Sequence, residues 1–185
     1  MSGAMKRTIK AVLAVALAAS LAGLAATRAQ AQAASDDPPP PSSLANHAVE
    51  TWAATYLQTD GWTLLTHDLE GAHLASAHGA LKLSGGLVET EIRTELFRPV
   101  SVGPGPARSG VAHWAVDCRR QRLAVLSMTI YSHNNLKGEL ARKPAAPRTW
   151  QEPNESELVT MGVICKAART GGRLDARPLI SAKPS

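Results

Sequence analysis

The chain has 185 residues, with 20 lysine and arginine residues against 15 aspartate and glutamate residues, and 44% of its residues are hydrophobic. That length accommodates one domain with terminal extensions, and the apolar content excludes a wholly disordered chain. Two cysteines are too few for a disulfide-dense scaffold or a four-cysteine zinc site. The formal net charge of +5 points to nucleic acid or an anionic membrane as a partner only if the basic residues remain after processing.

Residues 1–31 have the three parts of a secretory signal peptide. A positively charged start is followed by an uncharged run, residues 11–26, and by two overlapping Ala-x-Ala cleavage patterns in residues 29–33. The uncharged run is shorter than the roughly 20 apolar residues that a membrane-spanning helix needs. We therefore expect export, removal of this segment and no transmembrane segment in the mature chain.

Removal of the signal peptide changes the charge of the chain. It takes away Lys6, Arg7, Lys10 and Arg28 but no acidic residue, so the 20 basic groups become 16, against 15 acidic groups. Sequence motifs typical of RNA and DNA binding are also absent. The sequence therefore predicts no nucleic-acid partner.

The mature chain begins with a proline-rich linker at residues 32–43. Its four consecutive prolines, Pro38–Pro41, favour a stiff polyproline II spacer, and an ordinary disordered tail is the simpler interpretation. A single domain is expected at residues 44–168, followed by a basic, flexible tail at residues 169–185.

A helix is expected at the start of the domain, in residues 44–57. Its apolar residues recur one turn apart, which predicts a buried face. That face comprises Leu44, Ala48, Trp52 and Tyr56.

Apolar and polar residues alternate through the middle of the chain, which predicts an antiparallel sheet of about five or six strands. The pattern is clearest in residues 87–97. One face of this strand carries Val88, Thr90, Ile92, Thr94 and Leu96, and the other, a charged and solvated face, carries Glu89, Glu91, Arg93 and Glu95. Further strands are expected at residues 62–69, 72–76, 111–118 and 123–131, separated by glycine- and proline-rich breaks such as Gly103–Pro106.

The faces of the last two strands follow from the same alternation. In residues 111–118 the inward face is Ala112, Trp114, Val116 and Cys118, and His113 and Asp117 point outward. In residues 123–131 one face is Ala124, Leu126, Met128 and Ile130.

A second helix is expected near the C-terminus. Asn154 and Glu157 have the spacing of a capping box, and Leu158, Met161 and Cys165 then share one face of a helix that runs to about Ala168. The fold class is therefore α+β: an antiparallel sheet with a C-terminal helix packed on one face.

The two cysteines are expected to form one disulfide, Cys118–Cys165. An exported chain meets an oxidising compartment, and Cys118 lies on the inward face of its strand while Cys165 lies on the apolar face of the last helix. A redox pair or a pair of metal ligands is the alternative, but the sequence has no Cys-x-x-Cys motif and no suitably spaced histidines.

A run of features in the C-terminal two-thirds of the mature chain is shared with a known family. They are Arg108-Ser109, Asp117-Cys118, the strand at residues 122–131, Gly138, Trp150, the helix start at residues 152–156 and Ile164-Cys165. In this order they resemble the surface-adhesin protein E family. The resemblance implies a small α+β domain exported to the bacterial envelope, and the namesake members are lipid-anchored and bind host matrix and plasma proteins.

The chain departs from the namesake at two points. No cysteine follows the apolar run to carry a lipid, and residues 99–107 hold no lysine or arginine, whereas in the namesake this region is basic and binds partners. We expect a non-enzymatic protein-binding module in the periplasm or on the outer surface of a bacterium. Its expected partner is an extracellular or envelope protein; a homodimer and a periplasmic structural role stay open.

Candidate chemistry is sparse. His67, His73 and His78 are close in sequence, and a metal-dependent hydrolase that uses them is the enzymatic alternative. Their spacing matches neither a His-Glu-x-x-His site nor a structural zinc site, so surface histidines are the better interpretation. The sequence lacks a Gly-x-Ser-x-Gly elbow. No catalytic, cofactor-binding or metal-binding residue is therefore assigned.

One hairpin apex is a candidate for recognition. Tyr131, His133, Asn134 and Asn135 cluster there, and tyrosine and asparagine suit adaptable binding. Because Asn-Asn is also ordinary turn chemistry, a plain turn is the preferred interpretation. Partner-binding residues stay unassigned.

Overall fold

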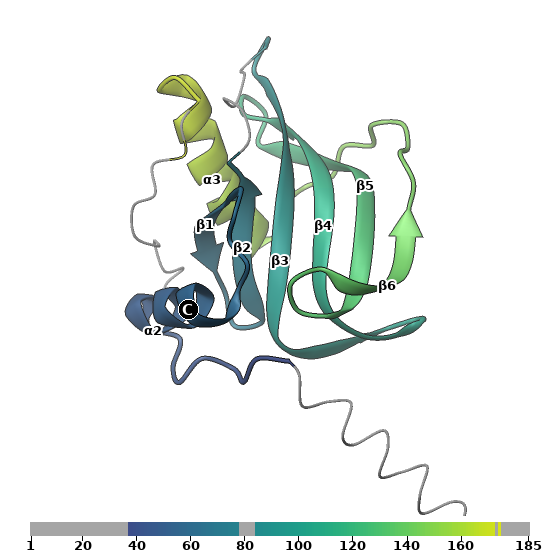
Figure 1. Ribbon diagram of the computed structural model, residues 1–185. Coiled ribbons are helices and arrows are strands. Elements are labelled where there is room, and N and C mark those ends of the chain that lie inside the picture. The colour runs from purple at the N-terminus through teal and green to yellow at the C-terminus, as the bar shows by residue number, and fades with distance from the viewer. Residues whose placement is uncertain (1–36, 78–83, 173, 175–185) are drawn as a thin grey trace, which may run out of the picture. The chain divides into compact units, whose positions relative to one another are not determined.

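The structure, a computed structural model, describes residues 37–77, 84–172 and 174. Six strands form one antiparallel sheet in chain order, which confirms the predicted fold class. The strands are β1 (Trp62–His67), β2 (Gly71–Ser76), β3 (Leu87–Val102), β4 (Gly105–Asp117), β5 (Arg122–His133) and β6 (Lys137–Lys143), and the helices are α2 (Asn46–Tyr56) and α3 (Glu155–Arg169) (Figure 1).

The sheet has a hydrophobic core on each face. The alternation of β2 shows this, because Ala75 joins the core under α3 while Ala72 and Leu74 join the core under α2. The C-terminal helix therefore packs on one face as predicted. The N-terminal helix α2 covers part of the opposite face, which the sequence pattern predicted to face solvent.

The C-terminal helix α3 begins as predicted. The Asn154 side chain accepts from the backbone N–H of Glu157 at 2.9 Å, and the Glu157 carboxylate accepts from the backbone N–H of Asn154 at 2.8 Å. This capping box satisfies two donors that a helix start otherwise leaves unpaired. Met161 and Cys165 are buried as expected, whereas Leu158 is 42% exposed.

The N-terminal helix α2 buries a different face from the predicted one. Its buried residues are Val49, Trp52 and Ala53, which have the i, i+3, i+4 spacing of one helical face. Leu44, which precedes the helix, and Tyr56 are exposed. The Trp52 indole N–H donates to the carbonyl of Pro39 at 2.6 Å, so the proline segment lies against this helix.

The hairpin of β3 and β4 is longer than predicted. The expected loop at Gly103–Pro106 is a turn at Gly103 and Pro104, and the strands pair up to Val102 and Gly105. Because β2 pairs only as far as Leu96 and β5 only as far as Ser109, the tip of this hairpin is a two-stranded extension. Pro106 is tolerated there because its missing N–H lies on an outer edge.

A β-bulge in β5 changes which residues share a face of this strand, so the predicted faces are partly wrong. His113 pairs with Ser127 but Trp114 pairs with Val125, so Leu126 is the extra residue. The alternation therefore shifts: Leu123 and Val125 contact the α3 core, while Ala124 is buried on the other face.

The disulfide is present as predicted. It joins Cys118, directly after β4, to Cys165 of α3, and the two Cα atoms are 5.7 Å apart. The bond therefore links the helix covalently to the sheet on the side of the α3 core.

Candidate functional site

An apolar groove lies on the α3 face of the sheet, where the helix does not cover the strands. Its volume is about 290 Å³. We call it the β3–β5 groove because its apolar lining comes from those strands and includes Ile92, Leu96, Val102, Val111, Met128 and Ile130. Two acidic residues, Glu70 and Glu157, also line it. The groove can therefore accept apolar side chains next to positive charge.

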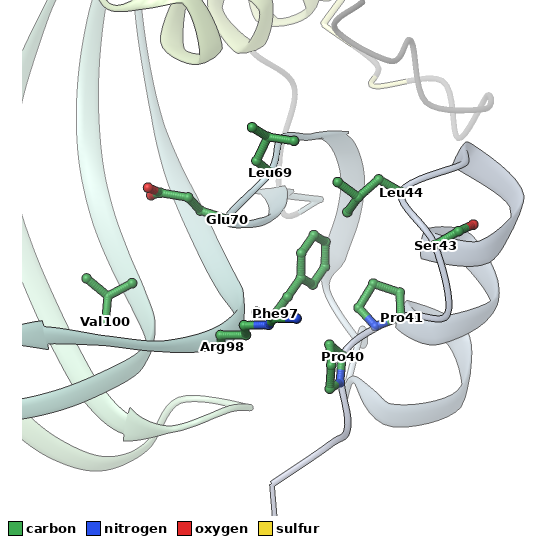
Figure 2. A pocket seen from close by; sticks show the side chains of 9 residues that line it. All are labelled: Pro40, Pro41, Ser43, Leu44, Leu69, Glu70, Phe97, Arg98 and Val100. Atoms are coloured by element: carbon green, nitrogen blue, oxygen red, sulfur yellow. The ribbon is translucent and has the colours of Figure 1, made fainter. Parts of the chain in front are cut away.

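A second pocket of about 320 Å³ adjoins this groove (Figure 2). It lies between the proline segment, the β1–β2 turn and the tip of β3, and Figure 2 shows the ring of Phe97 between Leu44 and Leu69. Leu69 is 75% exposed, which makes it the most exposed large apolar side chain of the described residues. Glu70 and Val100 line both cavities, so the two form one continuous surface.

The charged face predicted for β3 is solvated only at Glu89 and Glu91. Arg93 and Glu95, from the same face, are buried at 2% and 0% exposure. The Arg93 Nε donates to Glu95 Oε1 at 2.6 Å, and Arg93 also donates to the carbonyl of Gln58 at 2.7 Å. The prediction of a fully exposed face is therefore wrong, because the segment after α2 and the β5–β6 turn cover this end of the strand.

The β5–β6 turn is part of the same cluster. Asn134 donates to Glu95 at 2.8 Å, and the backbone N–H of Asn135 donates to both Glu95 oxygens at 3.1 Å. The Asn135 side chain accepts from the backbone of Gln58 at 2.7 Å and from Arg93 at 3.0 Å. Asn134 and Asn135 therefore lie in a turn, as the preferred interpretation had it, and this turn also joins β3 to the end of α2.

Burial and hydrogen bonding act in opposite directions on Glu95. Burial is the largest influence and raises the pKa of this carboxyl, whereas Arg93, Asn134 and the backbone of Asn135 lower it. The resulting pKa lies above its ordinary value. No signal in the sequence marked this cluster, because its members are up to 77 residues apart.

The histidines do not form a metal site among the residues that the structure describes. His67 is buried at 5% exposure, with its Nε2 3.1 Å from Asn46 Oδ1, so its interpretation as a surface histidine is wrong. His78 lies outside the described residues. In residues 37–77 and 84–172, no group of three or more histidine, cysteine, aspartate or glutamate side chains is placed to hold a metal ion.

His73 belongs to a cluster with Asp68 and Ser156. Its Nε2 is 3.0 Å from Asp68 Oδ2 and 3.3 Å from Ser156 Oγ, and the Ser156 hydroxyl donates to Asp68 at 2.7 Å. In a catalytic triad the acid and the nucleophile contact opposite ring nitrogens, whereas here both approach the same nitrogen. The cluster therefore ties the β1–β2 turn to the start of α3.

The carboxyl of Asp68 is stabilised in its charged form. Burial raises its pKa, but hydrogen bonds from His73, Ser156 and the backbone of Glu70 outweigh burial. The pKa of Asp68 therefore lies well below its ordinary value.

Asp117 also differs from its predicted position. It was expected on the outward face of its strand with His113, but it is only 3% exposed. Its Oδ1 accepts from the backbone N–H groups of Arg119 and Arg120, at 3.1 and 3.0 Å. This carboxylate therefore organises the β4–β5 turn.

Fold and surfaces together define a small, disulfide-linked α+β domain with an open apolar groove. The sequence model of the family described as "Surface-adhesin protein E" matches residues 62–166, more than half of the chain. The chain therefore belongs to the surface-adhesin protein E family. The matched region begins with β1 and ends one residue after Cys165, so it includes the whole sheet and both cysteines.

Solved structures of Haemophilus influenzae protein E are similar to this chain. One shares 14% identity over 59% of this chain and 87% of that one, with a TM-score of 0.40. Another, from non-typeable Haemophilus influenzae, shares 13% identity over 74% and 86%, with a TM-score of 0.43. A comparison with curated proteins found no match. The assignment to the family rests on the match of the family sequence model to residues 62–166.

Within residues 37–77 and 84–172, no helix has both the length and the apolar content to span a membrane.

Proposed function

We propose that this chain is an exported, non-enzymatic protein-binding module of the bacterial envelope, and that its β3–β5 groove receives apolar side chains of an extracellular or envelope protein. The single observation that carries the proposal is the uncovered apolar face of β3, β4 and β5. Concave, mostly apolar sites with a few polar groups at their edge are typical of binding sites.

The groove has a chemistry that selects its occupant. Its walls are apolar, so burial of a partner's leucine, valine or phenylalanine there contributes about 25 cal/mol for each Å² removed from water. Glu70 and Glu157 line the same groove. The preferred partner segment is therefore apolar and flanked by lysine or arginine.

The resemblance to the adhesin family supports the same location. Residues 99–107, which correspond to the region where the namesake binds its partners, form the tip of the β3–β4 hairpin. Val100, Val102 and Ala107 from this segment line the groove. Since the segment holds no lysine or arginine, we infer that its contacts with a partner are mainly apolar.

A pair of matched variants tests the groove. Val100 is 41% exposed and lines the groove, whereas Leu158 is 42% exposed and lies outside it. The probes are a panel of purified matrix and plasma glycoproteins, and a leucine- and valine-rich peptide flanked by lysines. We expect Val100→Glu to weaken binding by about tenfold or more, because it places a charge against apolar walls, and Leu158→Glu to bind like the wild type.

Two outcomes contradict this proposal. One is equal loss of binding in both variants, and the other is absence of binding to every probe. Concentration-dependent self-association that Val100→Glu abolishes would instead assign the groove to a second copy of the chain. A peptide flanked by glutamates in place of lysines tests the contribution of Glu70 and Glu157.

Export is tested separately. The signal peptide predicts a mature protein that begins near residue 32, and N-terminal sequencing of the protein from the cell envelope measures this directly. Protease treatment of intact cells then distinguishes the outer surface from the periplasm. Recovery of the full-length chain from the cytoplasm would contradict export.

A further inference from the structure

Four arginines and Trp150 line a pocket that shares no residue with the β3–β5 groove. The pocket has a volume of about 380 Å³, and we call it the arginine pocket. The arginines are Arg119, Arg120, Arg122 and Arg148. The proposed protein-binding function makes no use of these residues, so the pocket is a separate surface.

Gly85, just before β3, and Leu87, its first residue, line the arginine pocket together with three further segments. Arg119 and Arg120 lie in the β4–β5 turn, which the Asp117 carboxylate holds through two backbone N–H groups. Arg122 begins β5, and Trp150 arrives on the segment that precedes α3. That segment is fixed beside β5 because the backbones of Gln151 and Leu123 exchange hydrogen bonds at 2.9 and 3.2 Å.

Three of the four arginines, Arg119, Arg122 and Arg148, pack against neighbouring residues of the protein. The guanidinium carbons of Arg122 and Arg148 each lie 5.4 Å from the centre of the Trp150 ring, within the range of a cation–π contact. Arg119 lies over Gly86, where an added Cβ would come within 2.9 Å of its side chain. Because glycine leaves this space, the Arg119 side chain can stay beside the pocket.

The pocket keeps a surplus of positive charge. Asp117 lies 3.4 Å from Arg120 and 3.6 Å from Arg122, and Glu89 pairs with Arg148. Four guanidinium groups therefore face two carboxylates. Within the described part of the chain, Arg119 forms no ion pair, and the buried Nε of Arg122 has no hydrogen-bond partner.

We propose that the arginine pocket binds a phosphate monoester. Guanidinium groups present N–H donors in a planar fork that matches the oxygens of a phosphate, and such charge-assisted hydrogen bonds are among the strongest in proteins. A phosphate monoester carries close to two negative charges at neutral pH, which matches the surplus of the pocket. The phosphate can belong to a soluble molecule or to a lipid headgroup, and the two sources share this chemistry.

Calorimetric titration of the mature protein with phenyl phosphate and phenyl sulfate tests the ligand class. The two probes have the same shape, but the phosphate carries more charge, so we expect it to bind several-fold more tightly. Phenyl sulfate binding as tightly as phenyl phosphate would overturn the assignment to phosphate. If phenyl phosphate does not bind at concentrations up to about 10 mM, the dissociation constant is too high for a specific site, and this result would overturn the site itself.

Charge-matched variants test the location. Arg120 has a side chain that is 73% exposed, so Arg120→Gln removes one charge without disturbing the core. Arg142→Gln is the control, because it also removes one positive charge. Arg142 lies on β6 outside the pocket, with its guanidinium 2.6 Å from the Glu139 carboxylate. We expect Arg120→Gln and Arg148→Gln to weaken phenyl phosphate binding by about tenfold, the effect of one charge-assisted hydrogen bond, and Arg142→Gln to change it by less than about twofold. Equal loss of phenyl phosphate affinity in all three variants would show that the ligand responds only to the net charge of the protein, and would contradict a specific site at the arginine pocket.

Vesicles distinguish the two sources of phosphate. Mature protein that binds phenyl phosphate and also sediments with phosphatidic acid vesicles, but not with phosphatidylcholine vesicles, supports a lipid headgroup. Binding of phenyl phosphate without sedimentation supports a soluble ligand. Sedimentation that Arg148→Gln leaves unchanged would place the lipid contact elsewhere and contradict the arginine pocket as its site.

Discussion

Arg93 and Glu95 form a buried ion pair on β3, with the Arg93 Nε donating to Glu95 Oε1 at 2.6 Å. The two residues are two positions apart on the strand, so they share its face with the exposed Glu89 and Glu91. The carbonyl of Gln58 and the side chain of Asn135 also accept hydrogen bonds from Arg93. One ion pair therefore connects the sheet, the end of α2 and the β5–β6 turn.

The ion pair predicts a non-additive response to mutation. Arg93→Met leaves Glu95 buried without its charged partner, and we expect it to lower the free energy of unfolding by about 3–5 kcal/mol. Arg93→Met combined with Glu95→Met removes both charges, so the double variant is expected to be more stable than Arg93→Met alone. Urea denaturation measures both. If the double variant loses as much stability as Arg93→Met and Glu95→Met lose singly when added together, the coupling is contradicted.

The β5–β6 turn gives a second prediction, at Asn135. This residue has a φ of 61°, in the left-handed region, and its side chain bonds Gln58, Arg93 and Tyr56. Asn135→Ala loses those bonds and strains the backbone, with an expected cost of about 3 kcal/mol. Asn135→Gly loses the same bonds without the strain, so it is expected to be about 1 kcal/mol more stable than Asn135→Ala. Thermal denaturation that ranks alanine above glycine would show that backbone strain plays no part here.

The Asp68 cluster predicts a loss of stability in acid. Since the folded pKa of Asp68 lies below its ordinary value of 3.8, the charged carboxylate stabilises the folded state above about pH 4, and this contribution fades as the pH falls below that value. Asp68→Asn is therefore expected to cost about 1 kcal/mol or more at neutral pH and progressively less in acid. Urea denaturation of wild type and Asp68→Asn, from neutral pH to below about pH 4, measures how their stability difference changes with pH. A difference between wild type and Asp68→Asn that is constant with pH would contradict it.

The disulfide predicts a large stabilisation. Cys118 and Cys165 are separated by 47 residues, and closure of a loop of this length restricts the unfolded chain by about 4 kcal/mol. Cys118→Ala combined with Cys165→Ala is expected to lose this amount in guanidinium denaturation. The reduced wild-type protein serves as the control and should unfold at nearly the same denaturant concentration. A wild-type protein from the envelope with two reactive thiols would contradict the bond.

Features set by neighbouring residues could be predicted from the sequence. The capping box of α3 involves only Asn154 and Glu157, and the strand at residues 87–97 follows from its own alternation. The disulfide was also predictable, because only two cysteines are present and both fell on inward faces. Such local patterns are sufficient for the fold class and the order of the strands.

Features set by distant residues could not be predicted in this way. The burial of Arg93 and Glu95 depends on Gln58 and Asn135, far along the chain, and the bulge at Leu126 appears only when β4 and β5 pair. The β3–β5 groove could not be predicted from the sequence for the same reason. Alternation predicts which face of a strand is apolar, but not which part of that face a helix will cover.

Amide hydrogen exchange tests the central claim, that the β3–β5 groove is the protein-binding surface, most directly. Exchange is measured on the mature protein alone and with whichever glycoprotein or lysine-flanked peptide binds it. We expect slower exchange in residues 98–108, the two-stranded tip of the β3–β4 hairpin beside the groove, and unchanged exchange in β6. Protection of β6 or of the arginine pocket, with residues 98–108 unchanged, would contradict the account.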